Sequence, residues 1–239
     1  MILYGVISFL HTNAIKEKTM DEKEKILEAK QVYKIYRGRP VIRNATLTLH
    51  AGECVLITGN NGSGKTTLLH LLSGTTRTSL GTVWSRPKLS KQFASGSVAK
   101  DIGLSAMQFL ISMAILDGYS RHEAEPVCKE LFAHYGLMGM EKVAVNELSD
   151  SMFRKLMIAQ AMIKPCDLLF LDEPFMGLDT DMRNLLFADM IKMKKQNTAI
   201  LIVCPQKNET EHREKLVDKI WHIEHGEIKE AGNESNVAI

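Results

Sequence analysis

The chain has 239 residues, of which 45% are hydrophobic and 24% are charged, and its formal net charge is +2. This is the composition of an ordinary soluble globular protein that forms one large domain or two small ones. The small net charge argues against a nucleic-acid partner, since the cluster at 192–195 (KMKK) is better interpreted as a solvated helix end than as a basic patch.

The cysteines and histidines show no metal-binding spacing. Cys54, Cys128, Cys166 and Cys204 are scattered and form no Cys-x-x-Cys pair, which fits reduced, buried thiols in the cytosol. His222 and His225 are close in sequence but have no partners at ligand spacing, so we favour a structural role for them.

Residues 1–23 are expected to form an N-terminal extension without fixed structure. Its apolar run at 1–10 is far shorter than the roughly 20 residues of a spanning helix. No basic residue precedes this run, as one would in a signal peptide. Met20 lies just before the globular pattern, so residues 1–19 are either a disordered tail or an artefact of start-site choice. Residues 234–239 are expected to be a C-terminal tail.

Two segments at the start of the folded region, 26–36 and 41–50, alternate apolar and polar residues and predict half-buried strands. A buried strand at 54–57 follows, then the segment GNNGSGKTT at 59–67, then a helix. This is the context in which the pattern G-x-x-x-x-G-K-[ST] forms a phosphate-binding loop.

Glycines at 59, 62 and 64 allow backbone N–H groups to turn toward an anion. Lys65 would place its charge on the β- and γ-phosphates, and Thr66 would bring a hydroxyl to Mg²⁺. The expected nucleotide contacts in this loop are Gly59, Asn60, Asn61, Gly62, Ser63, Gly64, Lys65, Thr66 and Thr67.

Farther along the chain, 81–84 predicts a short strand, and helical spacing predicts helices at 105–116, 122–134 and 149–163. Methionine is frequent among these helices, either as core filler or as a surface that repacks against a partner. Strands are expected at 168–171 and 199–203, a helix at 183–196, and a hairpin at 219–229. Strands that alternate with helices imply a parallel sheet with crossover helices.

Asp172 and Glu173 follow the predicted strand at 168–171. Ligands of open α/β sheets bind at the carboxyl ends of strands, so Asp172 is a candidate Mg²⁺ ligand there. Glu173 is a candidate base for a water that attacks a phosphate.

Together these motifs resemble the nucleotide-binding domain of the ATP-binding cassette (ABC) family over residues 24–233. The resemblance implies an α/β fold of the P-loop NTPase type. Its features would be a mostly parallel sheet, a helical subdomain inserted at about 97–164, and an N-terminal antiparallel sheet. It also implies that Tyr36 stacks on adenine, and that Gln92 belongs to the ATP-binding residues and links the sheet to the helical subdomain.

The segment at 148–152 (LSDSM) resembles the family signature LSGGQ, and that at 175–179 (FMGLD) resembles the family's D-loop. In this family two domains pair head to tail. The resemblance therefore implies that Ser149, Ser151 and Asp179 act on ATP held by a second domain.

Two departures leave the rate of hydrolysis open. Asp150 places a carboxylate where the resemblance expects a phosphate to approach, and its alternative is an ordinary role at a helix N-terminus. The histidine expected after the last core strand is missing, because the strand runs into Pro205 and Gln206. Gln206 can form hydrogen bonds but carries no charge.

The resemblance thus implies an ATPase subunit that binds ATP and Mg²⁺ and uses Lys65 and Glu173 in catalysis. It would pair with a second ABC domain, as a homo- or heterodimer, and power a separate transmembrane permease from the cytoplasmic face. A bacterial-type exporter is favoured. Two alternatives remain open: a soluble ABC ATPase of a non-transport assembly, such as iron–sulfur cluster building, and a catalytically weak ATP-dependent switch subunit.

Overall fold

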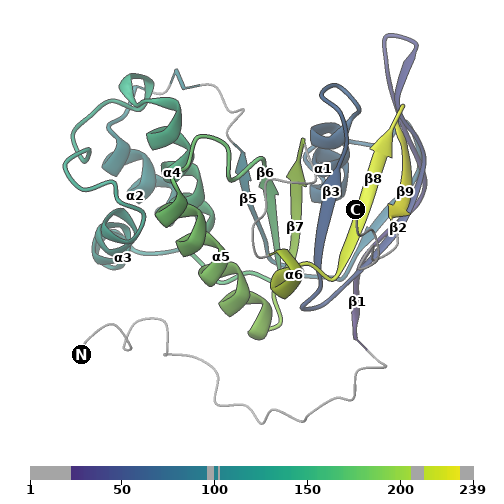
Figure 1. The fold of residues 1–239 in the computed structure, drawn as a ribbon. Coiled ribbons are helices and arrows are strands. Elements are labelled where there is room, and N and C mark those ends of the chain that lie inside the picture. Colours follow the sequence, from purple (N-terminus) through teal and green to yellow (C-terminus); the bar gives the residue numbers. More distant parts are fainter. Residues whose placement is uncertain (1–22, 96–99, 102, 206–212, 232–239) are drawn as a thin grey trace.

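The computed structural model describes residues 23–95, 100–101, 103–205 and 213–231. In Figure 1 a small sheet lies at one side of the molecule, a larger sheet runs through the middle, and a group of helices lies at the other side. Three predicted features fall outside the described residues: the N-terminal extension up to residue 22, Gln206, and the tail at 234–239.

The small sheet is antiparallel, with strand order β2-β1-β4. Its strands are β1 (Lys25–Tyr36), β2 (Arg39–His50) and β4 (Leu80–Ser85). Buried side chains roughly alternate with exposed ones along β2, because one face of the sheet packs on the core. The predicted N-terminal antiparallel sheet is confirmed.

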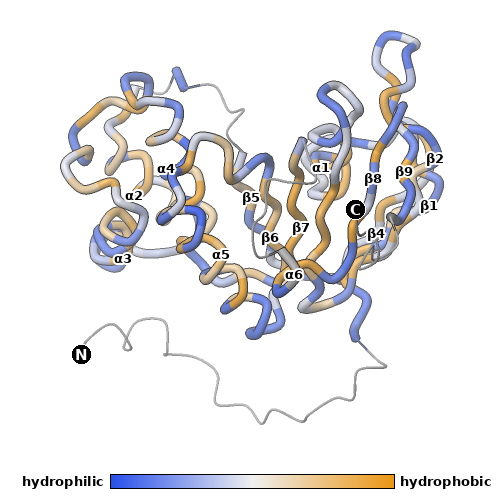
Figure 2. Tube along the Cα trace, in the orientation of Figure 1, coloured by the Kyte–Doolittle hydropathy of each residue, from blue (hydrophilic) through white to orange (hydrophobic). Residues whose placement is uncertain are grey.

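The larger sheet has the strand order β5-β6-β7-β3-β8-β9, and every neighbouring pair except β8 and β9 is parallel. Its strands are β3 (Cys54–Thr58), β5 (Lys91–Ser95), β6 (Leu168–Asp172), β7 (Ala199–Cys204), β8 (Lys219–Glu224) and β9 (Glu227–Ala231). The central strands β3, β6 and β7 are buried along their whole length, and Figure 2 shows them as hydrophobic stretches. Helices therefore have to cover both faces of this sheet.

Hydrophobic clusters lie on the two faces of the larger sheet. Leu56 of β3 points into one cluster and Ile57 into the other, as strand alternation requires. Helix α1 (Lys65–Ser73) packs on the face that also meets the small sheet, and α5 (Thr180–Lys195) packs on the opposite face. Helix α6 (Arg213–Leu216) is a single turn before β8.

The helical group contains α2 (Ala106–Leu116), α3 (Arg121–His134), the 3-10 turn η1 (Val145–Glu147) and α4 (Asp150–Ala161). Ser105 and Ser120 start α2 and α3 with capping boxes, in which a side chain three residues later bonds back to the cap. These helices lie where helical spacing predicted them. The division of the chain into domains remains a prediction.

Several local predictions are corrected. Helix α5 begins at Thr180 rather than Arg183, because Asp179 caps it by accepting the N–H of Met182 at 2.8 Å. Strand β5 was not predicted. Its sequence KQFAS has weak strand preference, and pairing with β6 from Lys91 to Ser95 holds it in the sheet.

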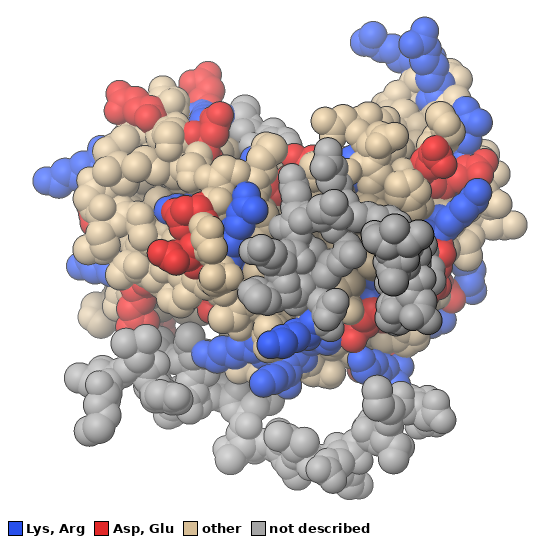
Figure 3. Space-filling view, in the orientation of Figure 1, with Lys and Arg blue, Asp and Glu red and all other residues tan. Residues whose placement is uncertain are grey.

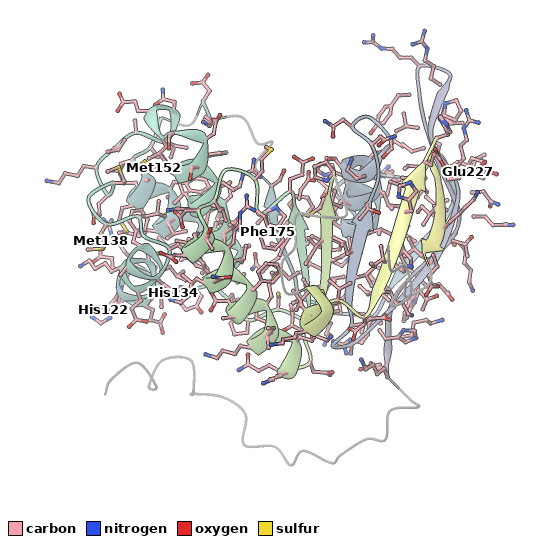
Figure 4. The ribbon with its side chains drawn as sticks, in the orientation of Figure 1. His122, His134, Met138, Met152, Phe175 and Glu227 are labelled. Atoms are coloured by element: carbon pink, nitrogen blue, oxygen red, sulfur yellow. The ribbon has the colours of Figure 1, made fainter. Side chains whose placement is uncertain are left out.

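All four cysteines are buried and free, as predicted. The methionines of the helical group mostly fill its core, but Met138 is exposed at its outer edge (Figure 4). Within the described ranges, no helix has both the length and the apolar character to cross a membrane.

Lysine and arginine side chains gather along the edge below α5 and α6 in Figure 3. This edge includes the end of α5, where Lys192 and Lys195 are exposed and Lys194 pairs with Asp218 at 2.7 Å. The KMKK cluster is therefore a solvated helix end, as predicted. The cluster lies near the start of β3, since Asp218, the partner of Lys194, accepts the N–H of Cys54. The glycine-rich loop follows the other end of β3.

Candidate functional site

The glycine-rich loop turns sharply from the end of β3 into α1, and neighbouring strands press against it. At Gly64, where φ is 105°, a Cβ would lie 2.9 Å from the carbonyl oxygen of Val41 in β2. At Gly59 a Cβ would lie 2.3 Å from the carbonyl oxygen of Ile223 in β8. Glycine is thus required at both positions by strand packing as well as by the turn.

Lys65 is the first residue of α1, and its side chain folds back over this loop. Its Nζ donates hydrogen bonds to the carbonyl oxygens of Gly59 and Asn60, both at 2.9 Å. Burial lowers the pKa of Lys65, while the nearby carboxylates of Glu173 and Asp172 oppose that shift. A bound phosphate would likewise raise the pKa of Lys65 and so favour its charged ammonium form.

Thr66 and Asp172 connect the start of α1 to the end of β6. The Thr66 hydroxyl donates to Oδ1 of Asp172 at 3.3 Å. Asp172 is only 3% exposed, and burial raises its pKa. Its Oδ2 is buried without a hydrogen-bond partner among the described residues, which costs free energy unless a cation or donor binds there.

These oxygen donors fit Mg²⁺, which prefers carboxylate and hydroxyl oxygens and completes its shell with water and phosphate. No three side chains of His, Cys, Asp or Glu come together as a metal site in the part of the chain that the structure describes. A magnesium ion held by Thr66 and Asp172 would therefore take its other ligands from the substrate and from water.

Glu173 follows Asp172 and adopts a positive φ of 50°, which is uncommon for a residue with a side chain. Its N–H donates to the carbonyl of Val203 at 2.9 Å, and its own carbonyl accepts from Arg154 Nη1 and from the N–H of Met176. These bonds hold the unusual backbone, and the Glu173 side chain lines the same pocket as Lys65.

Arg154 was not predicted as a site residue. It is a buried arginine on α4, and it reaches across to the backbone of Glu173. Only its place just after the LSDSM segment could have suggested it. The link between the two residues depends on tertiary packing that no local pattern encodes.

The pocket has a volume of about 290 Å³, at the lower end of ligand pockets, which suits a phosphate chain better than a whole nucleotide. Its lining residues are Val41, Asn61, Gly62, Gly64, Lys65, Thr66, Thr67 and Glu173. Val41 was not predicted, because β2 comes to the loop only in the folded chain.

Tyr36 does not line this pocket. It ends β1 at the tip of the hairpin with β2, where it is exposed, and Lys34 Nζ lies 4.9 Å from its ring centroid. Its predicted stacking on adenine remains a prediction.

The structure does not bring Gln92 to the phosphate loop. Gln92 is the second residue of β5, where it is buried, and its Nε2 donates to Oδ2 of Asp117 at the end of α2, at 3.1 Å. This bond connects the sheet to the helical subdomain, and the predicted contact of Gln92 with ATP remains a prediction. Ser95 is the residue of β5 that pairs with Asp172, at the end of the sheet that carries the site. Sequence reasoning could not make this distinction, because it did not predict β5 and so had no register.

The residues predicted to act across a dimer lie away from this pocket. Ser149 is exposed and caps α4, with Oγ accepting the N–H of Met152 at 3.2 Å, and Ser151 lies in the first turn. Figure 1 shows α4 on the far side of β5, β6 and β7 from α1, and Figure 4 shows Met152 near the start of α4.

Asp179 is 64% exposed, and besides capping α5 it lies 3.7 Å from Lys155 Nζ. The segment before Asp179 is anchored by Phe175, which stacks on Phe187 of α5 with centroids 4.7 Å apart (Figure 4). The predicted action of Ser149, Ser151 and Asp179 on a second domain's ATP remains a prediction.

Comparisons with known proteins show the family and the fold of the chain. The sequence pattern of the family described as ABC transporter matches residues 42–176. The daunorubicin/doxorubicin resistance ATP-binding protein DrrA of Streptomyces peucetius is 31% identical over 212 residues, covering 84% of this chain but only 63% of that protein. The cytochrome c biogenesis ATP-binding export protein CcmA of Escherichia coli (strain K12) is 32% identical over 187 residues, covering 76% of this chain and 89% of that protein.

Solved structures share the fold. A dimeric ATP-binding cassette in a post-hydrolysis state, bound to ADP and Pi, superimposes with a TM-score of 0.73 at 20% identity, covering 86% of this chain and 98% of that chain. A nucleotide-free ATP-binding cassette from an ABC transporter gives 0.69 at 17% identity, covering 87% and 91%. At such identities the similarity shows the fold alone.

The expected P-loop fold is therefore confirmed, and the phosphate loop, the strand-end carboxylates and the matched sequence pattern all lie in one structure. The chain belongs to the ABC transporter family, as an ATP-binding nucleotide-binding domain.

Proposed function

We propose that this chain is the ATP-hydrolysing subunit of a membrane exporter, acting from the cytoplasmic face on a separate membrane-spanning protein. The observation that carries the proposal is the placement of Lys65, the Thr66–Asp172 pair and Glu173 around one pocket. Each group has a distinct role in hydrolysis of the phosphoanhydride bond of a nucleoside triphosphate, so their convergence favours catalysis over simple nucleotide storage.

In this proposal the loop N–H groups and Lys65 bind the β- and γ-phosphates of ATP. Thr66 and Asp172 hold Mg²⁺, which when bound supplies positive charge that offsets the charge of the phosphates. Glu173 accepts a proton from the attacking water. Arg154 keeps the Glu173 backbone in its unusual conformation, and Tyr36 stacks on adenine.

One side of the proposed ATP site must come from another subunit. Ser149 and Asp179 are exposed and neither lines the phosphate pocket of its own chain, so a contact with ATP would be with nucleotide held by another subunit. A structural relative bound to ADP and Pi is dimeric, which supports a pair of such domains. A second copy of this chain is the simplest partner.

Export is supported by the relatives, whose names refer to drug resistance, Nod factor export and cytochrome c biogenesis export. Ile115 and Met138 are exposed apolar residues on the helical group, and Leu116 is 77% exposed. Such side chains favour contact with an apolar partner surface. We therefore place the contact with the membrane protein on this part of the helical group.

The test is to isolate the tagged full chain from membranes of its native host and to measure ATP turnover with and without what co-purifies. We expect an integral membrane protein and faster turnover in its presence. Co-purification with a soluble assembly instead would support the non-transport alternative. Tight ATP binding without turnover, alone and with the partner, would support the switch alternative.

A further inference from the structure

Lys100 contacts the signature segment at several points, although it lies 50 positions earlier in the chain. It lies between β5 and α2, and its Nζ donates to Oδ1 of Asp150 and, at 3.3 Å, to the carbonyl oxygen of Leu148. The same ammonium lies 5.3 Å from the ring centroid of Phe153. Lys100 therefore holds a defined position over the start of α4.

Asp150 is the signature residue that departs most in charge from the family pattern. Its side chain is 94% exposed, next to Ser149, and the hydrogen bond from Lys100 lowers its pKa, so it is a carboxylate at neutral pH. The cations of α4 itself have other partners: Arg154 donates to the carbonyl of Glu173 and adds only a weaker charge effect on Asp150, and Lys155 faces Asp179. Within the described residues, Lys100 is the only cation that forms an ion pair with Asp150.

An exposed carboxylate beside Ser149 would oppose the approach of a triphosphate, because like charges across an interface are unfavourable. A carboxylate in the first turn also stabilises its own helix through the helix dipole. Asp150 can therefore stabilise α4 without repelling the triphosphate only if a cation pairs with its carboxylate and leaves it at the start of the helix. The contacts of Lys100 satisfy that condition.

We propose that Lys100 is a positioning residue for the ATP-bound dimer: it neutralises Asp150, so that the signature segment of one copy can close on the γ-phosphate held by a second copy. This inference rests on the proposed function, since it needs an ATP-driven dimer. It assigns a role to a lysine outside every family motif, and it explains how the chain tolerates Asp150.

The experiment measures ATP-driven dimerisation of the full chain by analytical ultracentrifugation in the Glu173→Gln background, which keeps ATP intact. Lys100→Ala should weaken dimerisation by about tenfold per site, the size expected for one unit charge beside a phosphate in a wet interface. The defect should shrink in high salt, which screens exposed charges. Lys100→Arg should retain dimerisation.

Rescue separates charge compensation from a merely structural contact. Adding Asp150→Asn to Lys100→Ala should restore dimerisation, because no carboxylate is then left to neutralise. A structural tie between Lys100 and α4 would stay broken in that double variant. Lys129→Ala removes an exposed lysine from α3 and serves as the matched control, with dimerisation expected to be unchanged.

Dimerisation and charge compensation by Lys100 can each fail separately. If the Glu173→Gln protein stays monomeric at saturating ATP, pairing of two copies of this chain is overturned and this inference with it, whereas the proposed function fails only if the chain isolated from membranes shows no ATP turnover. If that protein dimerises, and Lys100→Ala dimerises equally well or is not rescued by Asp150→Asn, only the role of Lys100 is overturned. Binding of a fluorescent ATP analogue to the monomer checks that each variant is folded.

Discussion

In the phosphate-loop region, Lys65 and Asp172 are 5% and 3% exposed, and Lys65, Thr66 and Glu173 have partners within the chain. In the signature region, Asp150 and Asp179 are 94% and 64% exposed, and each has one ion-pair contact. The first region is held by buried contacts within the chain, whereas the second has only local helix caps and surface pairs. Substitutions in the first should therefore change the isolated chain, and those in the second should change assembly.

Glu173→Gln should give the largest effect, since it removes the candidate base from the phosphate-loop region. We expect ATP turnover to fall by about 10²–10⁴-fold, the usual contribution of a general base. ATP affinity should be kept, because Gln has a similar shape. The measurement is phosphate release under saturating ATP. Glu130→Gln, an exposed position on α3, is the control, and turnover of the Glu173 variant within tenfold of the parent would contradict the assignment.

Lys65→Met should weaken ATP binding by about 3 kcal/mol, or on the order of a hundredfold, because it removes a buried cation from the phosphates. Lys91→Met is a matched control. Burial also lowers the pKa of Lys91, but its nearest acceptors are in Ser73 and Ser85, away from the pocket. Titration with a fluorescent nucleotide would test the pair, and equal losses in both variants would refute a specific role for Lys65.

The two regions also differ in how far their residues could be predicted from the sequence. The phosphate loop and the Asp172–Glu173 pair were predictable because each is a short local pattern next to a buried strand. Arg154 and Val41 were not predictable, because they reach the site through tertiary packing. The surroundings of Gln92 were not predictable for the same reason: its side chain faces Asp117 at the end of α2, and only the pairing of β5 with β6 fixes which residue lies beside Asp172.

In the signature region the sequence left the role of Asp150 open between a charge that opposes closure and an ordinary helix N-terminal residue. Both readings describe one side chain in isolation. The structure adds Lys100, a partner that lies outside the motif and is separated by 50 positions. No local sequence pattern could predict this ion pair, because it depends on which distant residue the fold places beside Asp150.

Ser149→Ala tests whether the exposed region acts only in assembly. Loss of the cap on α4 should lower the free energy of unfolding by about 1 kcal/mol. ATP-driven dimerisation should fall further than this stability change explains. Ser120→Ala removes the equivalent cap from α3 and should cost similar stability with no change in dimerisation. Urea unfolding and ultracentrifugation of both variants would show the difference, and matched dimerisation would place Ser149 in a capping role alone.

The smallest expected effect is on the free energy of unfolding of the nucleotide-free chain. It tests whether the buried carboxylate of Asp172 destabilises the folded chain when no cation is bound. Burial raises the pKa of Asp172, so the charged form is disfavoured in the folded state. The stability linked to this group is therefore present below the unfolded pKa of about 3.9 and is lost as pH rises through the folded pKa. Asp172→Asn should raise the free energy of unfolding at pH 7 by about 1 kcal/mol, the low end of the cost of an unsatisfied buried group.

Asp167, the residue just before β6, provides the opposite sign. Burial alone would raise its pKa, but hydrogen bonds from Ser90 and the guanidinium of Arg86 outweigh burial and lower it. Its contribution is present above the unfolded pKa and is lost as pH falls through the folded pKa. Asp167→Asn should therefore destabilise the chain at pH 7, by about 0.5 kcal/mol because solvent screens this partly exposed pair. Urea unfolding from pH 3 to 7 without Mg²⁺ measures both variants. Shifts of the same sign would show that Asp172 is satisfied in the free chain, and its orphaned oxygen would no longer indicate a metal site.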